Sequence, residues 1–137
     1  MTEKLPPISD AELLLLRALW DVGAARVREL LAVLPPERWA YTTVQTLLYR
    51  LEEKGYVVAD RAGSAHVFAH SVSRDSLLGR RLEELATKLC DGAAGPLVLN
   101  LVEHGKFSAD EIARFRQLLD DHEARSDGDR NKRRKRS

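Results

Sequence analysis

A row of polar side chains suited to contacting DNA bases occupies residues 42–50. Arginine and glutamine can form paired hydrogen bonds to purine edges in the major groove, and threonine can contact a phosphate or a thymine methyl group. The candidates are Thr42, Thr43, Gln45, Thr46, Tyr49 and Arg50. On one face of a helix, these residue types indicate a DNA-reading surface. The same face would also suit a solvated helix in a domain that binds protein.

A second candidate contact surface is the segment that holds Arg61, Ser64 and His66. A cation and a hydroxyl near the tip of a hairpin can meet the DNA backbone, where they would bind phosphate. A single arginine on a loop is also commonly just solvated. From the residues alone both interpretations stay open.

Metal binding and catalysis are not expected. His66 and His70 are four residues apart, which places them about 13 Å apart on a strand, too far to share one ion. Cys90, the only cysteine, lacks the setting of a nucleophile, and no paired carboxylates accompany it. We therefore expect no metal, no cofactor, no small-molecule substrate and no enzymatic activity.

The elements that must position the candidate DNA-reading surface are three short helices. Ser9 and Glu12 have the spacing of a capping box, so a helix should begin there and end near Gly23. Apolar residues over 27–34 predict a second helix, which Pro35 and Pro36 end.

The third helix carries the candidate surface. We expect Thr42 or Thr43 to cap it and Gly55 to close it. Its apolar residues follow the spacing of one buried stripe, formed by Val44, Leu47, Leu48 and Leu51. The polar row lies on the opposite side of this helix.

Residues 56–61 and 66–70 predict a β-hairpin. Both runs are rich in valine and aromatic residues, and Gly63 lies between them at the expected turn. Three helices followed by a hairpin predict a winged helix-turn-helix domain over residues 1–72. The whole chain should be mostly α, with this hairpin as its wing.

The remaining helical segments should form a dimerisation domain over residues 73–122. They hold too few apolar residues for an independent core, so a second copy of the chain is the simplest partner. The residues expected to hold the homodimer are Leu78, Leu82, Leu85, Leu89, Leu97, Val98, Leu101 and Phe115.

Charge is unevenly distributed over the 137 residues. The net charge is +1, but residues from Ala124 onward carry +5 and the rest of the chain −4. Residues 123–137 should therefore be a disordered basic tail, which could bind phosphates or simply raise solubility. The single cysteine and the lack of a long apolar stretch indicate a cytoplasmic protein.

Three segments resemble the BlaI/MecI family of penicillinase and methicillin-resistance repressors. They are ISDAELLLLRALW, WAYTTVQTLLYRLEEKGYV and PLVLNLVEHGKFSADEIARFRQLL, in the family's order over about Ile8 to Leu119. The resemblance implies a homodimeric repressor that binds a palindromic operator in double-stranded promoter DNA. It also implies a membrane sensor-protease partner that responds to a β-lactam, and cleavage of the repressor at the position matched here by Asn100 and Leu101.

Overall fold

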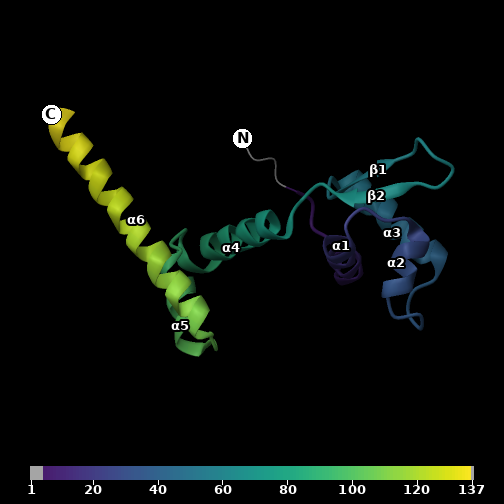
Figure 1. The fold of residues 1–137 in the computed structure, drawn as a ribbon, viewed down its shortest axis with the longest axis horizontal. Coiled ribbons are helices and arrows are strands. Elements are labelled where there is room, and N and C mark those ends of the chain that lie inside the picture. Colours follow the sequence, from purple (N-terminus) through teal and green to yellow (C-terminus); the bar gives the residue numbers. More distant parts are fainter. Residues whose placement is uncertain (1–4, 137) are drawn as a thin grey trace.

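The structure, a computed structural model, describes residues 5–136 and contains two regions of different construction (Figure 1). The first comprises α1 (Asp10–Val22), α2 (Val27–Val33), α3 (Tyr41–Lys54), β1 (Val57–Asp60) and β2 (Val67–His70). The second comprises α4 (Arg74–Cys90), α5 (Gly95–His104) and α6 (Ala109–Arg136), which extend away from the first. The expected class, mostly α with a small β-hairpin wing, is confirmed.

Helix α1 begins with the predicted capping box. The Ser9 hydroxyl accepts a hydrogen bond from the Glu12 backbone N–H at 3.1 Å, and the Glu12 carboxylate accepts one from the Ser9 N–H at 3.3 Å. Gly23 follows the helix with a φ of 82°, which favours glycine because it has no Cβ. Leu15, Leu16 and Leu19 of this helix are completely buried.

Helix α3 packs its predicted apolar stripe inward and ends at Gly55, whose φ of 91° is left-handed. The prediction that Thr42 or Thr43 caps the helix was wrong. Ala40 is the cap residue and makes no side-chain hydrogen bond, so both threonines lie inside the first turn with exposed side chains. The residue just before this cap, Trp39, is buried in the core.

The wing is an antiparallel pair in which Val57 lies opposite His70 and Asp60 opposite Val67. Phe68 of β2 is only 1% exposed and exchanges two backbone hydrogen bonds of 2.8 Å with Ala25. The wing is therefore attached to the core through the segment that joins α1 and α2, and its tip at residues 61–65 is exposed.

One hydrophobic core lies within the first region. It is built from α1, α2, α3, the wing and the segments between them, and the first turn of α4 joins it through Leu77. The second region has no comparable interior. Leu77 and Ala86 are the buried residues of α4, and α5 has none.

Helix α6 corrects the expectation of a disordered tail, because residues 123–136 continue the helix to Arg136. Its polar residues support one another along the helix: Gln117 donates to the Asp121 carboxylate at 2.9 Å, and Arg125 donates to the Asp121 carbonyl at 3.4 Å. Basic residues in the last turns also favour the negative end of the helix dipole. Local charge patterning thus supports a helix that has almost no apolar face.

Among residues 5–136, none of the helices combines the length and apolar character needed to cross a membrane.

Candidate nucleic-acid interface

The candidate recognition helix α3 is anchored at its C-terminal end by a charged pair. Lys54 Nζ donates to the two carboxylate oxygens of Glu12 at 3.0 and 2.9 Å. Burial raises the pKa of Glu12, but hydrogen bonds from Lys54 and Ser9 and the Lys54 charge outweigh it, so its pKa is lowered overall. Glu12, which is 3% exposed, therefore both caps α1 and ties α1 to the last turn of α3.

The outer face of α3 presents most of the predicted DNA-contacting side chains to solvent. Thr42, Thr43, Thr46, Tyr49 and Arg50 are exposed, and Gln45 is half-buried. Gln45 Nε2 donates to the Tyr49 hydroxyl at 3.3 Å, and the Tyr49 ring lies 6.1 Å from that of Phe68. These contacts orient the middle of the face toward the wing, and Thr42 and Thr43 lie exposed in the first turn of the helix.

A cleft of about 440 Å³ separates α3 from the start of α2 and from the wing tip. Gln45 and Tyr49 line one side of it, and Ser64 lines the other. His66 of the wing lines it too. Five further polar or aromatic residues of the lining were not among the DNA-contacting candidates of the sequence analysis: Arg26, Arg28, Glu29, Tyr41 and Phe68.

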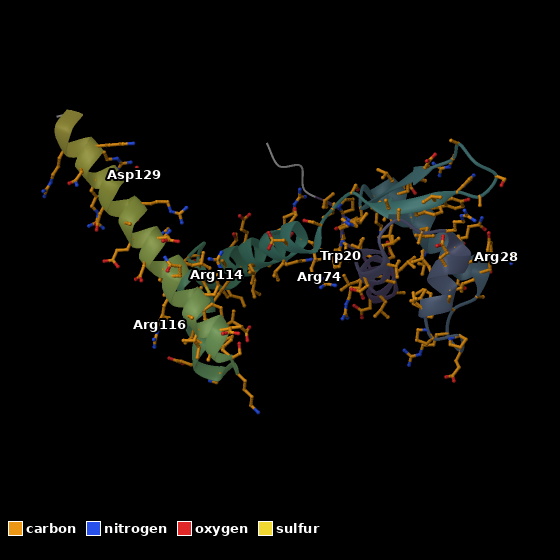
Figure 2. All side chains as sticks on the ribbon, in the orientation of Figure 1. Trp20, Arg28, Arg74, Arg114, Arg116 and Asp129 are labelled. Atoms are coloured by element: carbon orange, nitrogen blue, oxygen red, sulfur yellow. The ribbon has the colours of Figure 1, made fainter. Side chains whose placement is uncertain are left out.

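The missed arginines lie on the helix that precedes the recognition helix. Arg26 and Arg28 are exposed at the N-terminal end of α2, and Figure 2 shows Arg28 at the edge of this region. In helix-turn-helix proteins the first helix of the motif crosses the DNA backbone, so cations there can neutralise phosphate. Their position at the start of the helix that precedes the recognition helix was a signal that could have identified them.

Arg50 and Arg61, both predicted to contact DNA, have different surroundings. Arg61 forms two hydrogen bonds with the Glu52 carboxylate, at 2.7 and 2.5 Å. The Arg61 hydrogen bond lowers the pKa of Glu52, and the same contact raises the pKa of Arg61. Among the described residues, none forms a hydrogen bond or ion pair with the Arg50 side chain. Arg50 is thus available for a ligand, whereas Arg61 links the wing to α3.

The residues predicted to hold a dimer lie on α4, α5 and α6. A groove between α4 and α5 brings together Leu82, Leu97, Val98 and Leu101, and it does not include Leu78, Leu85, Leu89 or Phe115. The four α4 leucines are 38–73% exposed. Phe115 instead packs against Phe107 with ring centroids 5.0 Å apart. Leu97 and Phe115 are half-buried, and the other six are exposed.

The candidate cleavage position lies inside α5. Asn100 and Leu101 are both exposed, and Leu101 retains 56% of its accessible surface. The Asn100 carbonyl is 3.0 Å from Nδ1 of His104, in the last turn of the helix.

Three packed helices, an attached two-stranded wing and an exposed polar face on the third helix define the class of winged helix-turn-helix proteins. The sequence profile of the penicillinase repressor family matches residues 8–121, and the chain belongs to this family. The family consists of DNA-binding transcriptional repressors, so the chain is a DNA-binding repressor and not an enzyme.

Similar proteins align over most of the chain. The penicillinase repressor of Bacillus licheniformis is 27% identical over 90% of this chain and 97% of its own length. The transcriptional regulator BlaI of Mycobacterium tuberculosis is 33% identical over 88% of each chain. Among solved structures, the DNA-binding domain of the repressor BlaI is 29% identical, covers 55% of this chain and 93% of its own, and gives a TM-score of 0.47.

Proposed function

We propose that the chain represses transcription as a homodimer whose two winged domains bind the two halves of a palindromic operator. The observation that carries this proposal is the row of exposed leucines on α4: Leu78, Leu82, Leu85 and Leu89. Leucines at this spacing form one stripe on a helix, and a stripe that stays largely exposed in its own chain is stabilised by contact with another chain. The groove between α4 and α5 extends the same apolar surface.

On DNA, α3 would occupy the major groove. Arg50 and Gln45 would contact base edges, because their side chains can form paired hydrogen bonds with purines. The threonines of the first turn would meet phosphate or thymine methyl groups. Ser64 and the two arginines at the start of α2 would neutralise or bind the flanking backbone. Arg61 would lie near the DNA backbone, held there by its ion pair with Glu52.

A gel-shift assay with the promoter next to the gene, at two salt concentrations, tests this function. Promoter DNA with two-fold related half-sites about one helical turn apart should be bound, and log K should fall with log salt by about 0.9 per phosphate contacted. A random duplex of equal length is the control. Equal binding to both duplexes, or binding without salt dependence, would instead favour a winged-helix module that binds protein.

We further propose that cleavage between Asn100 and Leu101 releases the repressor, through a membrane sensor-protease that responds to a β-lactam or another cell-wall signal. A protease needs an extended substrate, and α5 is a short helix with no buried residue. Local opening of such a helix costs little, so the bond can become accessible without unfolding the DNA-binding domain. The cut would separate α6 and the end of α5 from α4 and thereby remove part of the dimer surface.

A chain that ends at Asn100 tests the release step, with a chain that ends at Asp121 as its control. The shorter chain should keep its winged domain, sediment as a monomer and lose about 10²- to 10⁴-fold in operator affinity, because its two reading domains are no longer linked. The control should dimerise and bind like the full chain. If the shorter chain also dimerises and binds normally, cleavage is not the switch.

A further inference from the structure

The junction between the winged domain and α4 is held by side chains from the end of α1. Trp20 Nε1 donates a hydrogen bond to the Val72 carbonyl at 2.9 Å. The Arg74 guanidinium lies 5.4 Å from the centre of the Trp20 ring, and Arg74 also forms an ion pair with Asp21 at 3.2 Å. Figure 2 shows Trp20 and Arg74 together where α4 leaves the winged domain.

At this junction α4 continues directly from the core of the winged domain. Val72 and Leu77 are buried in the core of the winged domain, at 8% and 7% exposure. Leu78, the next residue, begins the exposed leucine row on the same helix. Helix α4 therefore has one end embedded in the DNA-reading domain, and most of its length carries the proposed dimer surface. Leu77 and Leu78 are consecutive residues of α4, so the helix itself joins the two.

The length of α4 amplifies small changes of angle at the junction. Its residues 74–90 span about 25 Å at 1.5 Å per residue. A tilt of about 8° at the base would move the far end by about 3.4 Å, which equals the rise of one base pair. The angle at which α4 leaves the winged domain is therefore tied to the separation of the two recognition helices in a dimer.

We propose that Trp20, Asp21 and Arg74 act as an elbow that fixes this angle and so selects the spacing between half-sites in the operator. They are positioning residues, because none of them lies in the cleft beside the recognition helix. Asp21 and Arg74 have 71% and 61% exposed side chains, so their pair adds little to the stability of the fold. To fix the angle at which α4 leaves the winged domain, the contacts need only make other angles less favourable in free energy. The inference rests on the proposed dimer bound to two half-sites.

The test uses the full chain and duplexes that the wild type selects from a random library. The selected sequence is resynthesised with its natural spacing, with one or two base pairs added or removed between the half-sites, and as a single half-site. The variants are Arg74→Ala, Trp20→Phe, which keeps an aromatic ring but loses the N–H donor, and the two combined. Lys88→Ala is the control, because it removes a cation from the last turn of the same helix, at the end away from the junction.

The combined variant should remain a dimer by sedimentation and bind the single half-site within about two-fold of wild type. Its preference for the natural spacing should fall about five-fold, as expected when a weak ion pair, a cation–π contact and one hydrogen bond are lost. The single variants should show smaller losses and the control none.

Three results would overturn the elbow. The first is an unchanged spacing profile in a variant that is dimeric and binds the half-site normally. The second is an equal loss on the single half-site, which would show that the contacts only support the reading domain. The third is a wild type without any spacing preference, which would reject the two-half-site proposal itself.

Discussion

The two regions of the chain use similar apolar spacing to opposite effect. In α1 and α3 the stripe residues Leu15, Leu19, Leu48 and Leu51 are completely buried against one another's helices. In α4 the equally regular stripe that begins at Leu78 stays exposed. The first region can therefore fold around its own core, whereas the second, in the proposed dimer, would gain most of its stability by covering its apolar surface with the other chain. Repression that depends on pairing can then be lost without damage to DNA reading.

The largest expected effect comes from breaking the second region alone. Replacing Leu82 and Leu85 by aspartate places charges in the exposed stripe, which should abolish dimers and weaken operator binding by about 10²-fold or more. Sedimentation and gel shift measure the two losses. Ser76→Asp, which adds a carboxylate to the first turn of the same helix, should leave both unchanged. Dimers that persist in the double variant would show that the exposed stripe of α4 is not the dimer surface.

Substitutions in the core of the first region should lower its stability independently of dimerisation. Leu15→Ala removes a completely buried side chain and should cost about 2–5 kcal/mol of unfolding free energy, independent of protein concentration. Leu14→Ala, at a neighbouring position that is 44% exposed, should cost well under that amount. Leu85→Ala should instead lower the melting temperature by an amount that depends on protein concentration. Denaturation of each variant at two concentrations measures these differences.

Within the DNA interface, Arg50 and Arg61 should differ. Arg50→Ala should cost about 1–3 kcal/mol of discrimination between operator and random duplex, because an unpaired arginine on the outer face can bind a base edge. Arg61→Ala should weaken both duplexes alike and by less, since this side chain is already paired with Glu52. Binding of both variants to both duplexes is the measurement. Equal losses on the two duplexes for Arg50→Ala would make it a phosphate contact.

The smallest expected effect concerns the pair that anchors α3. The pKa of Glu12 is lowered in the folded chain, so the pair contributes fully above the ordinary value of 4.5 and is lost as pH falls through the lower folded value. Glu12→Gln should cost about 1–2 kcal/mol at neutral pH and flatten the acid side of the stability curve. Urea denaturation between pH 3 and pH 7 provides the test, with Glu53→Gln on the exposed face of α3 as control. An unchanged acid limb would mean that the pair contributes nothing.

Much of the fold followed from local chemistry in the sequence. The spacing of Val44, Leu47, Leu48 and Leu51 predicted which face of α3 is buried, because helix periodicity alone decides which residues share a side. Capping by Ser9 and a left-handed Gly55 were equally local, and so were predictable. The exposed polar face of α3 followed as the opposite side of the same stripe.

The prediction made from charge at the C-terminal end of the chain was wrong. The basic composition of residues 123–137 predicted disorder, since such segments bury little apolar surface. The structure continues α6 to Arg136, because Asp121 and Arg125 are one helical turn apart and cations near the C-terminal end of a helix match its dipole. Side-chain spacing, rather than composition, decided this segment.

Only the tertiary structure decided which distant residues meet. Lys54 reaches Glu12 across 42 positions of the chain, Arg61 reaches Glu52 rather than standing free on the wing, and Arg74 lies over Trp20. The cleft between the start of α2, α3 and the wing tip is likewise formed by residues that are distant in the sequence. Periodicity specifies one face of each helix but not the angle at which two helices cross, and it is those angles, set by packing of the shared core, that bring these groups within bonding distance.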